Sequence, residues 1–431
     1  MQSLYSSDVI ITHIDDPVYN RSNQRSIFQL PNDKNILTNM RLGNIGVYAN
    51  AASTYNGLIG ALGCIDSIQL MDAQNTVLDE LQNFPAYMGF KQYNSDPQTQ
   101  QDSNPVLHKN SMGMFYGGVM AVDGTGQKIQ KYEINAAARA VGTTEASTAT
   151  AWLLVSDVLP LLKTVLSLNT KVLRDLRLII NYTSDSANYI IESANVPFNT
   201  CQPLLIYDEN TGPLKPFEAM AYKSIEHDKI YVDAVIANGT ELTKQQSVKH
   251  TINGFNNKKV GKMLIVKSPT LLSTYQTGGN NMRYGKLGSI ACFKEELQID
   301  LNGHTLFNSD GITSDNERLA LLTDNFGPCS TYPFANGLAY NDVDANNRSS
   351  LISVGNDVIS NLDYYGFLVQ SEVSDLQINF RRVGVYIQGV GGTTDITATS
   401  SANQALELNL FAEVFKSVTS DNRGGYLVNY V

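Results

Sequence analysis

The sequence predicts an all-β protein made of two tandem antiparallel β domains. Three observations lead to this fold class. Apolar residues recur at alternate positions along many segments, helix signals are few and short, and one strand-and-turn pattern occurs twice. A chain of 431 residues is long enough for two domains of ordinary size.

Alternating apolar residues mark the strands. A period of two is typical of antiparallel sheets that bury one face against a core. A clear example is the set Leu176, Leu178 and Ile180, in which each apolar residue is two positions from the next. The segments with this pattern are 36–48, 173–182, 229–236, 260–266, 376–387 and 405–414.

Helices are expected in only three short segments, 75–87, 156–166 and 313–323. Ser156 or Asp157 can cap the second segment, which also has a proline in its first turn. The third begins with a capping-box pattern. No alternation of strands with long helices is visible, so doubly wound and barrel enzyme folds are disfavoured.

Two pairs of segments suggest an internal duplication. Residues 68–78 and 297–307 both read as a strand, a polar turn and an apolar pair, at an offset of 229 residues. Residues 176–180 and 406–410 share an apolar alternation at an offset of 230. Two matches at nearly one offset predict tandem copies of one β domain.

The boundary between the two domains is expected near residues 208–216. A strand over 203–207 ends there, and the following residues, DENTGPLKP, supply turn formers and prolines. We therefore expect an N-terminal domain over 1–210 and a C-terminal domain over 211–431.

Long polar stretches lie between the strands of both halves, at 91–112, 123–150, 268–287 and 325–350. Loops of this length in a compact domain usually carry function or contacts. We expect them to elaborate one face of the molecule.

The composition excludes several classes of protein. Charged residues make up only 17% of the chain, against about 25% in a typical soluble protein, and the net charge is −10. A general nucleic-acid binder would need a basic stripe, so specific nucleic-acid binding is not expected.

No targeting or membrane segment is expected. The first residues lack a basic region followed by a long apolar one, which predicts no secretory signal. The most apolar stretch, 149–168, is interrupted by Asp157, Pro160 and Lys163. The four cysteines are far apart in the sequence, so reduced thiols are expected.

The sequence predicts no catalytic, cofactor-binding or metal-binding residues, and hence no enzyme. It contains neither a nucleophile-elbow nor a phosphate-loop motif, and its five histidines share no metal-ligand spacing. The acidic stretch 300–317 does not fit a calcium loop and is interpreted as a polar turn before a helix. The basic pairs Lys258–Lys259 and Arg381–Arg382 are interpreted as solvated strand ends, with an acidic neighbour or a nucleic acid as alternatives.

Three segments carry a resemblance to a known family: 64–91, 203–209 and 293–328. Together they resemble the double jelly-roll major capsid proteins of eukaryotic double-stranded DNA viruses, particularly those of polinton-like viruses and virophages. The second segment resembles the family's link between its two jelly rolls. The third resembles the strand, turn and helix early in the second roll.

The resemblance implies a structural role in a virion. Each half would be an eight-stranded antiparallel jelly roll with a few short helices in its loops. A homotrimer would form a pseudo-hexameric capsomer that tiles an icosahedral shell. The partners would be the trimer mates, neighbouring capsomers and minor capsid or penton proteins, with the genome beneath a membrane or minor proteins. By the same analogy, the loops at 91–112, 123–150 and 325–350 would form trimer contacts or an outer crown.

Two further expectations complete the prediction. Residues 1–24 show little strand or helix pattern, so we expect an arm that a neighbour or the inner surface of the shell orders. The alternative function is a two-domain β-sandwich protein that binds or cleaves carbohydrate. A fibre or spike would show short repeats or a coiled coil, and neither is present.

Overall fold

The computed structural model describes most of both halves of the chain. The described residues are 9–93 without 52, 56–59 and 73; 115–122; 128–134; 140–214 without 185–189 and 192–196; 219–269 without 234–236, 239–240 and 243–248; 294–327 without 308–310 and 314; 364–393 without 384–387 and 390–391; and 406–431 without 421–425.

The first half contains two main antiparallel sheets, here named sheet I and sheet II. Sheet I consists of β1 (Ile10–Asp15), β18 (Leu204–Asn210), β4 (Asn35–Leu37), β5 (Arg41–Ile45), β13 (Ala151–Leu154) and β14 (Ser167–Asn169). Sheet II consists of β2 (Tyr19–Arg21), β3 (Arg25–Gln29), β15 (Arg177–Tyr182), β8 (Ile65–Met71) and β9 (Val77–Leu81). Smaller strands are β6 (Val47–Ala49), β7 (Ser53–Tyr55), β10 (Phe115–Val122), β11 (Lys128–Ile134), β12 (Ala140–Val141), β16 (Ile190–Ile191) and β17 (Phe198–Thr200).

The second half repeats this arrangement in sheets III and IV. Sheet III consists of β19 (Met220–Val232), β30 (Leu406–Ser420), β23 (Lys258–Pro269), β26 (Tyr364–Val373) and the C-terminal β31 (Tyr426–Tyr430). Sheet IV consists of β22 (Lys249–Thr251), β27 (Leu376–Val383), β24 (Lys294–Leu301) and β25 (His304–Thr305). Two small hairpins are β20–β21 (Ala237–Asn238, Glu241–Leu242) and β28–β29 (Gln388–Gly389, Gly392–Thr393).

The order of strands is the same in both halves and is that of a jelly roll. In sheet III the order is β19-β30-β23-β26. In sheet I, β1 pairs along one side of β18, while β4 and β5 both pair with its other side, so they act as one broken strand. The counterparts of β19, β30, β23 and β26 are therefore β1, β18, β4–β5 and β13–β14. Likewise β3-β15-β8-β9 in sheet II corresponds to β22-β27-β24-β25 in sheet IV.

This correspondence tests the two sequence matches separately. Residues 68–78 and 297–307 include β8 and β24, which are counterparts, so the first match is confirmed. The second match is wrong, because residues 176–180 lie on β15 and residues 406–410 lie on β30. The counterpart of β15 is β27. Any two strands with one buried face share an apolar alternation, so the pattern alone does not identify equivalent strands.

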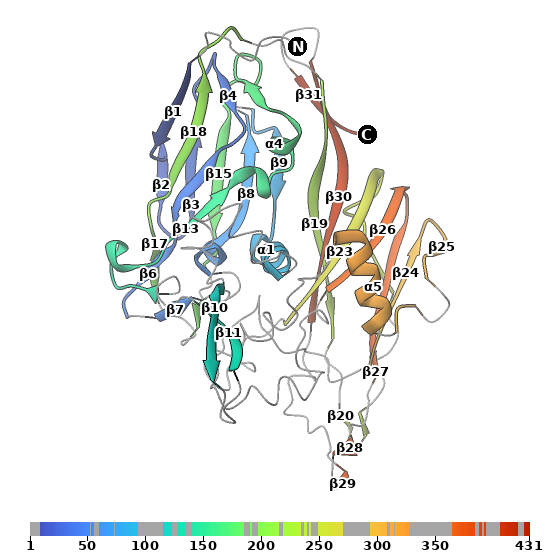
Figure 1. The fold of residues 1–431 in the computed structure, drawn as a ribbon. Coiled ribbons are helices and arrows are strands. Elements are labelled where there is room, and N and C mark those ends of the chain that lie inside the picture. The colour runs from blue at the N-terminus through green and yellow to red at the C-terminus, as the bar shows by residue number, and fades with distance from the viewer. Residues whose placement is uncertain are drawn as a thin grey trace.

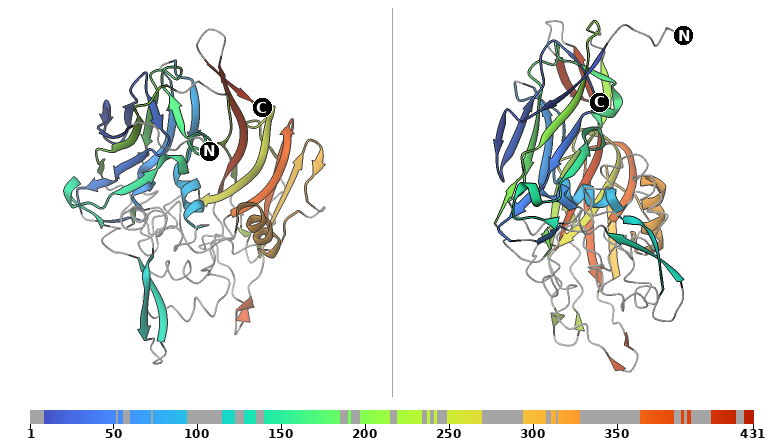
Figure 2. Two further views of the ribbon diagram at one scale, coloured as in Figure 1. Left: turned by 45° about the horizontal axis from the view of Figure 1, so that its top comes forward. Right: turned by 60° about the vertical axis from the view of Figure 1, so that its left-hand side comes forward.

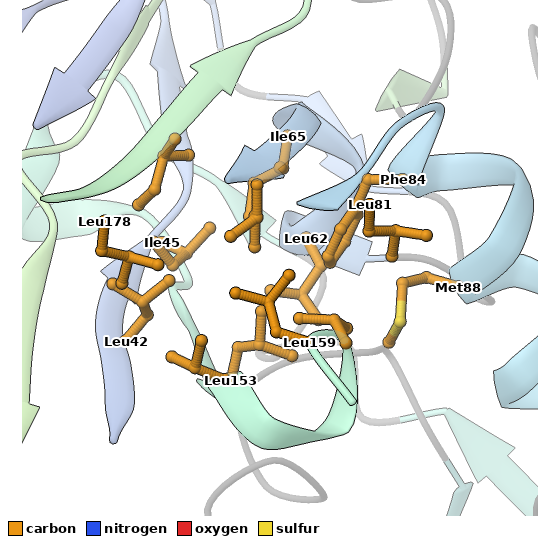
Figure 3. Packing of buried hydrophobic residues seen from close by; sticks show 14 of the residues in the cluster. Leu42, Ile45, Leu62, Ile65, Leu81, Phe84, Met88, Leu153, Leu159 and Leu178 are labelled. Atoms are coloured by element: carbon orange, nitrogen blue, oxygen red, sulfur yellow. The ribbon is translucent and has the colours of Figure 1, made fainter. Parts of the chain in front are cut away.

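The strands enclose two apolar cores. The first contains residues from both sheets of the first roll, including Leu42 and Ile45 of sheet I and Ile65 and Leu178 of sheet II (Figure 3). The second lies between sheets III and IV and includes Met263 and Ile299. The first core also contains residues of the second roll, such as Phe411 and Val418, so the two rolls share a continuous apolar contact.

The contact between the rolls lies near three helices: α1 (Phe84–Tyr93), α4 (Leu161–Thr164) and α5 (Asp315–Phe326). Helices α4 and α5 lie in or overlap the segments 156–166 and 313–323, where helices were expected. At α5 the Glu317 carboxylate accepts a hydrogen bond from the Thr313 N–H, and Gly327, with φ +87°, follows the last turn.

The helix expected over residues 75–87 is only partly confirmed. Residues 77–81 form β9, which pairs with β8, and the helix begins at Phe84 with Pro85 in its first turn. Asn83, with φ 48°, separates the strand from the helix. Pairing with the edge of sheet II thus outweighs the helical spacing of the apolar residues.

The expectation that a neighbour or the inner surface of the shell orders an arm over residues 1–24 is wrong for residues 10–15 and 19–21, which pair with strands of the same chain. Strand β1 pairs with β18 from Ile10↔Asn210 to Asp15↔Leu205, and β2 pairs with β3. His13 stacks on Tyr207 and lies 3.0 Å from the Glu209 carboxylate. A short segment of mixed polar and apolar residues gives no clear signal that its backbone pairs with a strand far away in the sequence.

The two rolls stand side by side, with the N- and C-termini at one end of the molecule (Figures 1 and 2). The β10–β11 hairpin and the small hairpins β20–β21 and β28–β29 lie at the other end (Figure 1). A loop was expected over residues 123–150, and the structure has strands β11 and β12 within this range. Most of the loops expected at 91–112, 268–287 and 325–350 lie outside the described residues.

We predict that Gly366→Ala destabilises the second roll. A methyl group at Gly366 of β26 would lie 2.6 Å from Phe326 Cδ2 and 2.8 Å from Leu322 Cδ1 of α5, which is closer than real contacts allow. Overpacking of this kind costs about 1–3 kcal/mol, measurable as a lower thermal unfolding midpoint. Gly261→Ala on the neighbouring β23 is the matched control, because its nearest contacts would be at 3.4 Å. Equal midpoints for the two variants would contradict this packing.

Candidate functional site: the contact between the two rolls

The edge of one roll meets the edge of the other. Strand β9 is the outermost strand of sheet II, and β19 is the outermost strand of sheet III. The Tyr222 hydroxyl of β19 donates a hydrogen bond to the carbonyl oxygen of Leu78 on β9. Burial raises the pKa of Tyr222, so this phenol stays protonated and remains a donor.

A buried carboxylate lies at the centre of this edge contact. Asp79 of β9 is fully buried. Its Oδ1 accepts a hydrogen bond from the Ser224 hydroxyl at 2.7 Å, and its Oδ2 accepts one from the Leu161 N–H at 2.9 Å. Asp79 therefore links β9 to the second roll through Ser224 and to α4 of its own roll through Leu161. A buried carboxylate without such donors would cost several kcal/mol.

Burial also sets the charge of this carboxyl group. Removal from water raises the pKa of Asp79 from 3.8 to about 6, although the hydrogen bonds from Leu161 and Ser224 and the charge of Lys416 oppose the rise. At neutral pH the group is thus largely ionised inside the contact.

A partly buried ion-pair network continues from Ser224 into the second roll. The ammonium group of Lys416 donates to the Ser224 hydroxyl at 3.3 Å and lies 2.9 Å from Glu226 Oε1. Lys258 lies 2.5 Å from the other oxygen of Glu226, and the Tyr430 hydroxyl donates to Glu226 Oε1 at 2.8 Å. Burial would raise the pKa of Glu226, but the two lysines and Tyr430 hold it below its usual range. This network fixes the edge of sheet III that faces Asp79.

Helix α1 covers a face of sheet III with aromatic contacts. Tyr87 packs against Phe411 of β30, with ring centroids 5.3 Å apart. Phe90 packs edge-on against Tyr364 of β26 at 5.2 Å and against Phe326 of α5 at 5.6 Å. Edge-to-face pairs at these distances stabilise a contact beyond the apolar area that they bury.

Amide groups complete the contact beside α1. The Asn83 side chain donates to Asn409 Oδ1 at 2.5 Å and lies 3.3 Å from Nε2 of His227. Burial lowers the pKa of His227 despite its hydrogen bond with Asn409. The amides pair without charge at a position where Asn409 is fully buried and Asn83 is half-buried.

The C-terminal strand adds a last link. Tyr426 of β31 donates its hydroxyl proton to Asp72 Oδ2 at 2.7 Å. Asp72 lies in the polar turn between β8 and β9, where its Oδ1 also accepts hydrogen bonds from the N–H groups of Gln74 and Thr76. The second roll is thereby tied to the first roll both at β9 and at the turn that precedes β9.

Apart from Lys258, for which an acidic neighbour was one alternative, no side chain of this contact was predicted from the sequence. Asp79 shares a strand face with Leu81, two residues later, and a carboxyl group on a buried face requires a partner. That is the only signal the sequence offers, and it does not identify Ser224, which is 145 positions away.

The two basic pairs singled out in the sequence are Lys258–Lys259 and Arg381–Arg382, and the structure describes the side chains of the first pair only. Lys258 is partly buried, pairs with Glu226 and lies over the ring of Tyr430, so it is part of the network described above. Lys259 is exposed and lies over the ring of Phe415. The side chains of Arg381 and Arg382 lie outside the described residues.

Among the residues that the structure describes, no group of three or more His, Cys, Asp or Glu is placed to hold a metal ion. None of the described helices is long and apolar enough to cross a membrane. Cys64 and Cys201 are buried free thiols.

The chain matches no family model and no curated protein sequence. It is similar in structure to the capsid protein of the virus PBCV-1, with a TM-score of 0.57 and 10% identity over 100% of this chain and 99% of that chain. It is also similar to the Sputnik virophage structure, with a TM-score of 0.52 and 10% identity over 100% and 90% of the two chains. The mavirus major capsid protein matches with a TM-score of 0.50 and 11% identity over 97% and 90%. These likenesses show the fold, a double jelly roll, and confirm the predicted fold class.

We predict a pH-dependent stability that Asp79→Asn removes. The folded chain holds a proton on Asp79 up to about pH 6, whereas the unfolded chain releases it near pH 3.8. The stabilisation from this group is therefore present below pH 3.8 and is lost as the pH rises through 6, by about 3 kcal/mol. Urea unfolding of both proteins between pH 4 and about pH 7 measures the difference.

Asp208→Asn is the control. Hydrogen bonds from Thr12 and Asn39 hold the pKa of Asp208 below its usual value of 3.8, so its contribution is lost only as the pH falls below 3.8. Between pH 4 and about pH 7 the difference in free energy of unfolding between the wild type and Asp208→Asn should therefore stay constant. The quantity to follow is the free energy of unfolding of the wild type minus that of Asp79→Asn. The assignment for Asp79 predicts that this difference falls between pH 4 and about pH 7. A difference that stays constant or rises would contradict it.

Proposed function

We propose that this chain is a major capsid protein whose homotrimer forms a pseudo-hexameric capsomer of an icosahedral virion. The observation that carries the proposal is the likeness of both rolls together, end to end, to the PBCV-1 capsid protein and to the mavirus major capsid protein. A match of one roll alone would be less informative, because single jelly rolls occur in proteins of many functions.

The proposed unit is the pair of rolls, divided at residues 210 and 211. Strand β18 ends at Asn210, and β19 begins at Met220. In the described part of the chain, strands before this point pair with one another, and strands after it do the same. The division follows the change of sheet rather than a break in packing, since the first core includes residues of both rolls.

The contact between the rolls supports their use as a rigid building block. Tyr222, Ser224 and Asn409 of the second roll all hydrogen-bond to the first roll, and aromatic side chains of α1 pack on sheet III. Two rolls held at a fixed angle give one third of a six-membered ring. Three copies then close the ring by a heterologous contact, in which two different patches meet.

The composition is consistent with extensive interfaces between subunits. Charged residues are only 17% of the chain. Burying an unpaired charge is costly, whereas amides and hydroxyls find hydrogen-bond partners at an interface. The partners proposed are trimer mates and neighbouring capsomers, followed by minor capsid or penton proteins.

The end of the molecule opposite the termini is proposed as the crown of the capsomer. The β10–β11 hairpin lies at that end (Figure 1). It follows the polar stretch 91–112, and β11 lies within the stretch 123–150, which the sequence singled out as a long loop.

We predict that the purified protein is a trimer. Three chains of 47.3 kDa give about 142 kDa, measurable by light scattering of the chromatographic peak. Electron microscopy of the same peak should show particles with a six-lobed outline. A stable 47.3 kDa monomer with no tendency to assemble would contradict the proposal, and glycan binding by that monomer would favour the carbohydrate alternative.

A further inference from the structure

A pocket lies on the side of sheet III that faces away from sheet IV, and it is here named the sheet III pocket. Val414 of β30 belongs to the second core, whereas its neighbours Glu413 and Phe415 line the pocket. Residues of β19, β23, β26 and the end of α5 complete the lining. The pocket has a volume of about 470 Å³, within the range of about 300–1,000 Å³ that is typical of small-molecule sites.

An irregularity in β23 shapes the floor of this pocket. The registers of β23 with β26 and with β30 both shift just after Val260. Val260 and Met263 therefore both lie in the second core, although regular alternation would place residues three positions apart on opposite faces. The same shift brings Lys262 to the face of Lys259, and both line the pocket. Irregularities that redirect a side chain in this way are common next to functional sites.

The pocket is locally basic in an acidic chain. Three lysines, Lys223, Lys259 and Lys262, line it together with two carboxylates, Glu413 and Asp324, which leaves one positive charge. The Glu413 carboxylate is shared, because Lys223 lies 3.2 Å from its Oε2 and Lys262 lies 3.4 Å from its Oε1. Lys259 is exposed, and the described part of the chain supplies no carboxylate partner for it. Its ammonium group is thus the charge that a ligand can neutralise.

An apolar surface lies next to this ammonium group. Lys259 and Lys223 both lie over the ring of Phe415, each 5.4 Å from its centroid. Leu368, which is 51% exposed, also lines the pocket. Between them Gly261 has no side chain, and a methyl group there would lie 3.4 Å from the Phe415 ring. The pocket therefore offers one unpaired cation beside an open apolar floor.

We propose that the sheet III pocket binds a small organic anion, a carboxylate carried on an apolar or aromatic group. The Lys259 ammonium group pairs with the carboxylate, and the apolar group packs on Phe415 and Leu368. Glu413 holds Lys223 and Lys262 in place and leaves Lys259 to the ligand. The pocket is formed by residues of one chain, so this inference goes beyond the proposed capsid role and does not rest on it.

Fluorine NMR of para-trifluoromethylbenzoate, titrated with the full-length protein, tests the proposal. The probe should show saturable line broadening, and Lys259→Gln should weaken its affinity by roughly fivefold or more. The matched control is Lys171→Gln, an exposed lysine of the first roll, which should leave the affinity unchanged. The neutral amide of the same probe should bind at least about fivefold more weakly than the carboxylate. No saturable binding, equal binding of the amide, or wild-type affinity in Lys259→Gln would each overturn the proposal.

A substitution that fills the floor gives an independent readout. Gly261→Val places a branched side chain, which suits a strand, beside Phe415 and should abolish saturable binding of the probe. A folded Gly261→Val protein, judged by its thermal midpoint, that binds the probe with wild-type affinity would overturn the proposal. Lys259→Gln changes an exposed side chain and keeps the test decisive if Gly261→Val does not fold. Light scattering of the same samples tests the capsomer separately, so a failure of one proposal is distinguishable from a failure of the other.

Discussion

A carboxyl group buried between two β domains is the constraint on which the rest of the structure depends. Asp79 lies at the border of sheet II and must find donors where water is absent. It finds them in Ser224 of the opposite roll and in the backbone of α4. Ser224 is in turn held by Lys416, and Lys416 by Glu226. Apolar packing by α1 brings the rolls together without direction, and this polar chain selects one relative position.

That fixed position links the fold to its proposed role. A ring of six rolls closes only if successive rolls meet at one angle, and half of the contacts in such a ring lie within single chains. The chain builds those contacts from β9, α1 and β19.

The sequence predicted the fold class from local patterns and could not predict the site. Period-two segments and the repeat between β8 and β24 were sufficient for two antiparallel β domains. The match between β15 and β30 failed because alternation reports burial of a face and not the strand's place in the sheet. The helix expected across residues 75–87 begins only at Phe84, because residues 77–81 pair with β8 as the second strand of a hairpin. The partners at the contact, Asp79 with Ser224 and Asn83 with Asn409, are joined across 145 and 326 positions, beyond the reach of any local pattern.

Calorimetry of the purified protein is the most direct test of the claim that the two rolls form one unit. The account predicts a single unfolding transition for the wild-type chain, with equal calorimetric and van't Hoff enthalpies per cooperative unit. It also predicts that Ser224→Ala combined with Asn83→Ala separates this into two transitions, one for each roll. Two independent transitions in the wild type, both unchanged by these substitutions, would contradict it.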